Sequence, residues 1–236
     1  MNAFAQIRAL VYLAIGVVAA QAQTVYDPAV QFSSTSNPTG VWSYGYTTTL
    51  GDAFFNLATY YHDPDGLDSW RYSPSSNPQV LHNPTTGTIT PPDSPTQFFD
   101  AGSVGLHPGQ NGELAIFRFT ALSAGDYQIV GKFYGDDNHP TTTDVHVLVN
   151  GVSVFDSAVG SFGFVTGTSF DITATLGLGG TIDFAVGYGS NGNYAFDATG
   201  LSAQVTAIPE PSTYAALFSL SALGFAAYCR RRRRTG

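Results

Sequence analysis

The sequence predicts an all-β protein, an antiparallel β-sandwich of jelly-roll type. Charged residues make up only 11% of the chain, while 26 glycines and 14% aromatic residues are present. Apolar residues alternate with period two, and no segment of residues 23–208 keeps a helical period of 3.6 residues over three turns. Short strands separated by Gly, Pro and Asn about every 8 to 12 residues are typical of such sandwiches.

The individual strands follow from the alternation of apolar and polar residues. It predicts strands over residues 113–122, 127–134, 144–149, 152–155, 169–176 and 182–188. Asn150 and Gly151 stand between two of these strands and tolerate positive φ, so they predict a tight hairpin turn. Residues 62–112 are rich in proline, and we expect edge strands and long loops there rather than a second domain.

The body of the chain is strongly acidic. Residues 23–208 contain three basic residues, Arg71, Arg118 and Lys132, and 16 acidic ones, which gives a net charge of −13. Such a surface repels nucleic acid and anionic lipid, so we expect no nucleic-acid partner. Arg118 lies in a mostly apolar strand, and we expect it to pair with an aspartate. The single cysteine, Cys229, excludes a disulfide framework.

The N-terminus has the pattern of a secretory signal peptide over residues 1–22. Arg8 is followed by an apolar run, and Ala20 and Ala22 form the small-residue pattern of a cleavage site. We expect signal peptidase to cut after Ala22 and to leave Gln23 as the new N-terminus. A buried N-terminal helix or a membrane anchor is the alternative.

The C-terminal segment, residues 208–236, has three parts in a fixed order. Pro209, Glu210 and Pro211 come first, and an uncharged stretch over 212–228 follows that is just long enough for a transmembrane helix. A basic cluster ends the segment and consists of Arg230, Arg231, Arg232, Arg233 and Arg234. By the positive-inside rule, the arginines stay in the cytoplasm while the body crosses the membrane.

This ordered trio resembles the PEP-CTERM sorting signal of exported proteins in Gram-negative, exopolysaccharide-producing bacteria. The resemblance implies recognition by an exosortase, cleavage near the Pro-Glu-Pro motif, loss of the helix, and a final place in the cell envelope or extracellular matrix. A permanent single-pass anchor is the alternative. The resemblance leaves the body, which we interpret as one β-sandwich domain over residues 23–207, unexplained.

The sequence lacks the common catalytic motifs. No serine completes G-x-S-x-G, and there is no H-E-x-x-H motif and no Gly-rich phosphate loop. Glu113 is the one glutamate of the body, which excludes a Glu–Glu glycosidase pair but leaves Asp-based pairs open. We therefore predict no catalytic residues, with a polysaccharide hydrolase or lyase using Asp as acid and base as the alternative.

One acidic turn is a candidate site for structural calcium. Asp63, Asp65 and Asp68 place three carboxylates within six residues around a Pro and a Gly, and hard cations prefer such oxygen clusters. A solvated acidic turn is the alternative. A second cluster of the same kind comprises Asp136, Asp137, Asn138, His139 and Asp144.

Two sets of side chains are candidate glycan-binding sites. Trp42, Tyr44 and Tyr46 project from one side of a strand, either as an exposed platform for a polysaccharide or as part of the core. The second set lies in a Gly- and Asn-rich loop that offers stacking and acceptor groups: Tyr188, Asn191, Asn193, Tyr194 and Asp197. The alternative role of the two asparagines is to close a hairpin.

The segments His107-Pro108-Gly109 through Arg118-Phe119-Thr120, together with this loop, resemble secreted bacterial β-sandwich modules of the galactose-binding-like kind over residues 105–205. That resemblance implies a non-catalytic module, often stabilised by calcium, with glycan binding as a common use. The sequence therefore predicts an exported protein that binds or structures an exopolysaccharide. A purely structural protein of the biofilm matrix is a further alternative.

Overall fold

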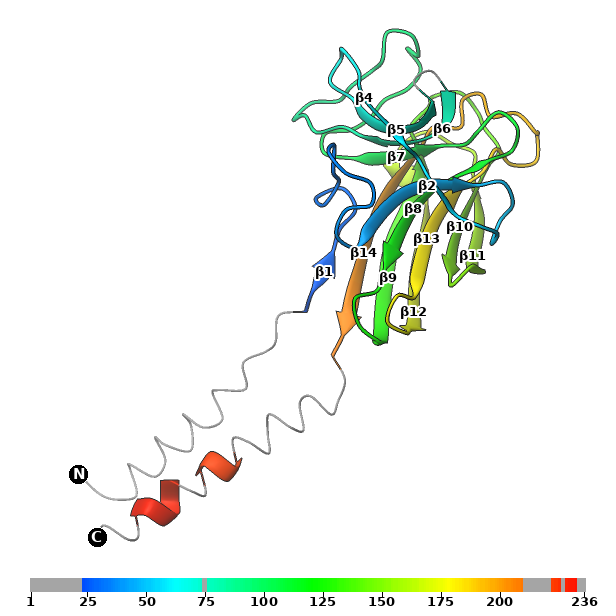
Figure 1. The fold of residues 1–236 in the computed structure, drawn as a ribbon. Helices are drawn as coiled ribbons and strands as arrows, with labels where there is room; N and C mark the ends of the chain where they lie inside the picture. The colour runs from blue at the N-terminus through cyan, green and yellow to red at the C-terminus, as the bar shows by residue number, and fades with distance from the viewer. Residues whose placement is uncertain (1–22, 74–75, 210–221, 226–227, 233–236) are drawn as a thin grey trace. The chain divides into compact units, whose positions relative to one another are not determined.

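The computed structural model describes residues 23–73, 76–209, 222–225 and 228–232 (Figure 1). Residues 25–207 form one compact unit, which is built from two antiparallel β-sheets. Residues 222–225 and 228–232 are helical. The fold class predicted from the sequence, an all-β antiparallel sandwich, is confirmed for this unit.

The predictions of a signal peptide and of a transmembrane helix concern residues that lie largely outside the described ranges. The signal peptide over 1–22 lies outside the described residues, and so does most of the transmembrane helix expected over 212–228. Within the described ranges, no helix is both long enough and apolar enough to cross a membrane.

Sheet A has the strand order β12-β9-β14-β7-β6-β5-β4, and β1 pairs with β14 beside this path. The bounds of its eight strands are β1 Val25–Tyr26, β4 Thr59–His62, β5 Asp68–Ser73, β6 Ser76–His82, β7 Val104–His107, β9 Gly125–Gly135, β12 Thr168–Leu176 and β14 Thr199–Ile208.

Sheet B has the order β11-β10-β13-β8-β2-β3. Its strands are β2 Trp42–Thr47, β3 Phe55–Asn56, β8 Leu114–Thr120, β10 Thr143–Val149, β11 Val152–Val159 and β13 Thr181–Val186, and a short 3₁₀ turn, η1, spans Phe164–Thr166. From β8 onward the chain passes repeatedly from one sheet to the other, so neighbouring strands in each sheet are mostly distant in sequence.

Aromatic side chains from both sheets fill the space between them. Trp42 and Tyr44 of β2 meet the ring of Phe117 edge-on at centroid distances of 5.1 and 5.0 Å, and Tyr44 also stacks on Trp70 of β5 at 6.0 Å. The indole N–H of Trp70 donates to the Ser33 carbonyl at 2.8 Å. The polar tips therefore have partners, and the rings contribute apolar area to a single core.

The predicted strands of the second half of the chain are confirmed to within a few residues. At the β10–β11 turn, Asn150 and Gly151 have φ values of 50° and 80°, as the hairpin prediction requires. Arg118 pairs with Asp183, as expected for a cation in an apolar strand.

The description of residues 62–112 as edge strands and loops is wrong in part. Strands β6 and β7 lie inside sheet A, with hydrogen-bonded neighbours on both sides. Their apolar side chains are buried, and the ladder tolerates Pro78 because the β5–β6 register shifts at a bulge beside it.

Candidate functional site

The outward face of sheet A carries a row of polar side chains across three strands. Trp70 pairs with Val80, and Val80 with Leu106, and these three side chains point into the core. The neighbouring register row, Arg71–Gln79–His107, therefore points to the opposite face, because successive residues of a strand alternate.

Two loop segments, 63–67 and 91–97, lie beside this row, and a small apolar cluster separate from the main core packs next to them. The cluster lies between the outward face of sheet A and the loop that follows β6, and it consists of Leu67, Leu81, Ile89, Phe99 and Ala198. The buried amide of Asn83 donates to the carbonyls of Gly87, Phe99 and Asp100 at 2.8 to 3.1 Å. These contacts position segments 63–67 and 91–97 as two walls above the sheet.

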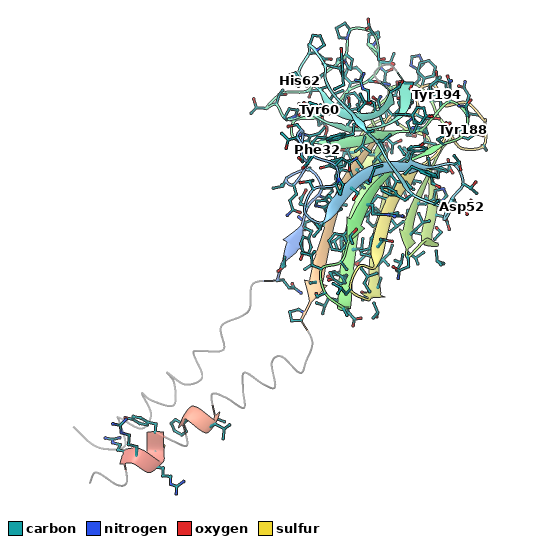
Figure 2. The ribbon with its side chains drawn as sticks, in the orientation of Figure 1. Phe32, Asp52, Tyr60, His62, Tyr188 and Tyr194 are labelled. Carbon is teal, nitrogen blue, oxygen red and sulfur yellow. The ribbon has the colours of Figure 1, made fainter. Side chains whose placement is uncertain are left out.

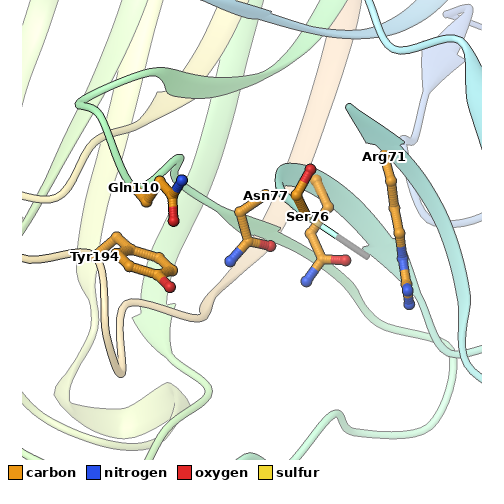
Figure 3. A pocket seen from close by; sticks show the side chains of 6 residues that line it. Arg71, Ser76, Asn77, Gln110 and Tyr194 are labelled. Carbon is orange, nitrogen blue, oxygen red and sulfur yellow. The ribbon is translucent and has the colours of Figure 1, made fainter. Parts of the chain in front are cut away.

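Two pockets share Arg71 and Gln79 as lining residues and together form what we call the groove. The smaller pocket, of about 200 Å³, has Tyr194 and Gln110 at one end and Arg71 at the other (Figure 3), and Ser76, Asn77 and Gln79 complete it. The larger pocket, of about 430 Å³, is bounded by the two walls and is lined by Asp63, Pro64, Asp65, Leu67, Arg71, Gln79, Leu81, Pro91, Pro92, Asp93, Ser94 and Gln97.

Arg71 is held in a fixed orientation where the two pockets meet. Its Nη2 donates to Asp63 Oδ2 at 2.5 Å and its Nε to Ser69 Oγ at 2.7 Å, while the guanidinium lies 4.5 Å from the centroid of the Tyr61 ring. Burial raises the pKa of Asp63 above its ordinary value, although the charge of Arg71 acts in the opposite direction. The cation is thus preorganised and does not have to be ordered by a ligand.

The end of the groove that contains Tyr194 lies over a buried histidine, His107. His107 Nδ1 lies 2.9 Å from Asn77 Nδ2 and 3.0 Å from the Pro108 carbonyl, and the Tyr194 ring meets the imidazole at 5.9 Å. Burial lowers the pKa of His107, so the ring is neutral at pH 7. The imidazole supports Asn77 and Tyr194 from beneath and is itself only 5% exposed.

The loop that presents Tyr194 is ordered by hydrogen bonds within the loop and by one hydrogen bond to Asp144. Asn191 Oδ1 accepts the N–H of Asn193 at 2.9 Å, Asn193 Oδ1 accepts that of Ala195 at 3.0 Å, and Asp144 Oδ1 accepts the N–H of Gly189 at 2.7 Å. The asparagines therefore close turns, and Tyr194 lines the groove. Tyr188 lies at the same end of the sandwich (Figure 2) but packs beside Gly112.

The expectation of an exposed aromatic platform on β2 is wrong for Trp42 and Tyr44. Their side chains are 1% and 0% exposed, because the strand turns this face toward sheet A. Tyr46 is the exception: it is half-buried and lies 5.4 Å from both Phe55 and Tyr72, which are 47% and 57% exposed. Tyr46, Phe55 and Tyr72 form a small aromatic cluster apart from the groove.

The three carboxylates of the acidic turn have separate partners. Asp63 binds Arg71, and Asp65 accepts the N–H of Leu67 at 3.3 Å. Asp68 is 6% exposed and accepts hydrogen bonds from Tyr60 at 2.5 Å and from the His62 ring at 2.7 Å.

In the part of the chain that the structure describes, no three His, Cys, Asp or Glu side chains are grouped to hold a metal ion. The second acidic cluster is likewise divided, since Asp137 accepts from Thr96 and Asp144 contacts His146. A structural calcium ion stays a prediction.

Besides Asp63, two aspartates that do not line the groove have raised pKa values. Burial, assisted by Asp100, raises the pKa of Asp136 well above its ordinary value. Burial also raises the pKa of Asp197 to about 7, although the Thr143 hydroxyl donates to its Oδ1 at 2.9 Å. Their side chains are 2% and 0% exposed, so both carboxyls are enclosed by protein.

Three groove residues were candidates in the sequence, Tyr194 for glycan binding and Asp63 and Asp65 as calcium ligands, but the polar floor of the groove was missed. Arg71, Asn77 and Gln79 belong to strands that the proline content concealed, and Gln110 stands in the loop before β8. One indication was available: Arg71 is one of three cations in the acidic body and lies in an alternating segment.

Comparison with known proteins adds one assignment and several structural likenesses. The PEP-CTERM protein-sorting motif matches residues 207–234, so the chain carries this sorting motif at its C-terminal end. No curated protein matches the sequence.

Among solved structures, the family 35 carbohydrate-binding module of Clostridium thermocellum is 17% identical, with a TM-score of 0.32 and coverage of 45% of this chain and 79% of its own. The CBM51 module of Clostridium perfringens GH95, in complex with methyl-galactose, is 11% identical, with a TM-score of 0.38 and coverage of 78% and 99%. Rabbit GITRL is 13% identical, with a TM-score of 0.29 and coverage of 40% and 73%. At these values the likeness carries no argument about function.

Proposed function

We propose that the chain is an exported protein, sorted at the membrane through its PEP-CTERM motif, whose β-sandwich binds an extracellular polysaccharide without transforming it. The observation that carries the binding role is the groove on sheet A, which the half-buried Tyr194 lines together with Arg71, Asn77, Gln79 and Gln110.

The groove offers the groups that sugar rings require. Guanidinium and amide side chains are planar and bind neighbouring hydroxyls through pairs of hydrogen bonds, and a tyrosine ring provides a flat apolar face for the C–H side of a sugar. Sites of this type are concave and have a few well-placed polar groups. Arg71 and Asn77 are already hydrogen-bonded in place, which lowers the entropic cost of binding.

The charge of the groove favours an uncharged ligand. Asp63, Asp65 and Asp93 line the larger pocket against one cation, Arg71. A uronate or sulfated chain would meet both this local excess and the net charge of −13 on the body. We therefore infer that the ligand is a neutral polysaccharide.

The sorting motif supplies the cellular context of the proposal. Signal peptidase and an exosortase would process the two ends, and the body would reach the cell envelope or extracellular matrix. The binding role is taken to be non-catalytic for two reasons. Asp136 and Asp197, whose pKa values are raised, are enclosed away from the groove. Asp63, the groove carboxyl whose pKa is also raised, is engaged by the Arg71 guanidinium.

Affinity measurements with purified full-length protein in detergent test the proposal. Soluble neutral polysaccharides and their uronate-containing counterparts would be titrated against the wild-type chain, Tyr194→Ala and Gln79→Ala. We expect binding to neutral chains only, and a loss of affinity of about tenfold or more in each variant, because these side chains touch the ligand directly.

Tyr72→Ala is the matched control, because it removes an exposed tyrosine from the aromatic cluster and leaves the groove intact. If Tyr72→Ala abolishes binding and Tyr194→Ala does not, the site is the aromatic cluster. Release of shortened chains by the wild-type protein would replace the binding role with an enzymatic one. Absence of binding to every polysaccharide would leave the purely structural role.

A further inference from the structure

Three loops at one end of the sandwich carry no charged residue. They comprise residues 121–125, 149–152 and 177–181. We call this surface the neutral end. It contrasts with the rest of the body, where 16 acidic residues are distributed over strands and loops.

The three loops form one connected surface. The Ala121 N–H donates to the Gly180 carbonyl at 2.8 Å, and the Gly179 N–H donates to the Ala121 carbonyl at 2.9 Å. Asn150 joins the third loop to them, since its Oδ1 accepts the Thr181 N–H at 2.9 Å and its N–H donates to the Thr181 carbonyl at 2.9 Å.

Large aliphatic side chains project from this surface. Leu122, Val152 and Leu178 are 63%, 67% and 77% exposed. Their loops are otherwise made of Gly, Ala, Ser, Asn, Thr and Val, so no long polar side chain screens them. Exposed leucines grouped on an uncharged surface mark a site of contact with an apolar partner.

The chain leaves the sandwich at the neutral end. Strands β9 and β14 are antiparallel neighbours, and the Asp136 N–H donates to the Ala198 carbonyl at 2.9 Å near the end of β9 and the start of β14. The other ends of both strands, where β9 begins and β14 ends, therefore lie side by side, as Figure 1 shows. The PEP-CTERM match begins at residue 207, which is the second-last residue of β14.

We propose that the neutral end rests on the lipid bilayer while the sorting segment holds the chain at the membrane, with Leu122, Val152 and Leu178 in the lipid interface. The inference rests on the membrane sorting described under the proposed function. Lipid is the occupant that fits, because the segment matched as a membrane-sorting motif begins at this surface, and because an acidic body can approach anionic headgroups only through an uncharged face. Two acidic residues border this surface. Asp126 follows Gly125 and accepts the Thr175 hydroxyl at 2.6 Å. The exposed Asp52 follows Gly51, whose backbone lies against Gly151.

Site-specific fluorescence on the full chain in vesicles tests this orientation. In a Cys229→Ser background, single cysteines at Leu122→Cys and Leu178→Cys would carry an NBD label, in vesicles of phosphatidylcholine and phosphatidylglycerol. Val165→Cys is the control, because Val165 is 91% exposed and its loop contacts Gly135, at the opposite end of β9. We expect blue-shifted emission at positions 122 and 178 and quenching by doxyl-labelled lipid several-fold stronger than at 165.

Each other outcome overturns the inference in a recognisable way. If the chain floats with the vesicles but labels at 122 and 178 behave like the label at 165, the orientation is wrong and the sorting role stands. If the blue shift persists in detergent and increases with protein concentration, a second copy covers the surface instead of lipid. If the full chain does not float with vesicles, membrane sorting itself fails, and the orientation fails with it.

Discussion

Arg118 and Asp183 form a bidentate ion pair across the β8–β13 ladder. The Arg118 Nε donates to Asp183 Oδ1 at 2.6 Å and its Nη2 to Oδ2 at 2.7 Å, and the Phe54 ring lies 4.0 Å from the guanidinium. The Asp183 side chain is 4% exposed, so the pair is largely shielded from water on the outward face of sheet B.

Breaking this pair on one side should destabilise the fold. Asp183→Leu leaves the guanidinium without its counter-ion, and we expect a loss of about 3 kcal/mol in the free energy of unfolding. Arg118→Met combined with Asp183→Leu removes both charges and should recover part of the loss. Urea denaturation of the single and double variants measures the difference, and equal stability of the two would contradict it.

Asp197 makes stability depend on pH. Burial raises its folded-state pKa to about 7, whereas an unfolded aspartate has its ordinary value of 3.8. The folded state therefore binds more protons between these values, and this group's effect on stability becomes less favourable as the pH rises from about 4 to about 7. We expect Asp197→Asn to flatten the melting temperature over this range and to raise it at neutral pH.

His146 should also make stability depend on pH, but over a different pH range. Burial alone would lower its pKa, but hydrogen bonds to Asp144 at 2.8 Å and Asp156 at 2.5 Å raise it above the ordinary value of 6.5. Its stabilising contribution is complete below pH 6.5 and is lost as the pH rises through the folded-state pKa. His146→Gln should therefore lower the melting temperature more at pH 5 than at pH 9, and an equal effect at both would count against the ion pairs.

Gly189 is expected to be essential for the loop that presents Tyr194. Its φ is +66°, and a Cβ there would collide with the backbone carbonyl of Thr142. Gly189→Ala should weaken glycan binding by displacing Tyr194. Gly192→Ala is the matched control, because Gly192 has a similar φ of +65° but a Cβ would lie 3.5 Å from the Tyr188 ring, in ordinary contact. Equal glycan affinity of the two variants would show that the conformation of this loop does not affect binding in the groove.

Substitution of Trp42 and of Tyr72 should affect stability differently, because Trp42 lies in the core and Tyr72 on the surface. Trp42→Ala empties a fully buried site and should cost about 3 to 5 kcal/mol in unfolding free energy. Tyr72→Ala removes a side chain that is 57% exposed and should change the unfolding free energy by less than about 1 kcal/mol. Chemical denaturation of both variants checks the contrast.

The sequence predicted the second half of the sandwich well because its strands alternate cleanly and its hairpin turn has a distinct chemistry. Asn150 and Gly151 both adopt the positive φ that their side chains allow. Prediction was weaker for β5 to β7, where proline content suggested an edge, although Val80 and Leu106 are fully buried in the sheet interior.

The groove could not be derived from the sequence because it depends on long-range register. Arg71, Gln79 and His107 become neighbours only through the pairing of three strands, and Tyr194 arrives from a loop more than 80 residues away. Alternation on β2 correctly placed Trp42, Tyr44 and Tyr46 on one face but could not say that this face meets sheet A.

The position of β14 determines how the fold responds to a pull on its tail. This strand lies between β9 and β7, with β1 also paired to it, so a force transmitted through Ile208 along the strand acts on several ladders at once. The inter-strand hydrogen bonds run perpendicular to that force and are strained together in shear rather than one by one. For a molecule held at the membrane by this tail, as proposed above, drag from the surrounding fluid would therefore be resisted by the middle of the sheet.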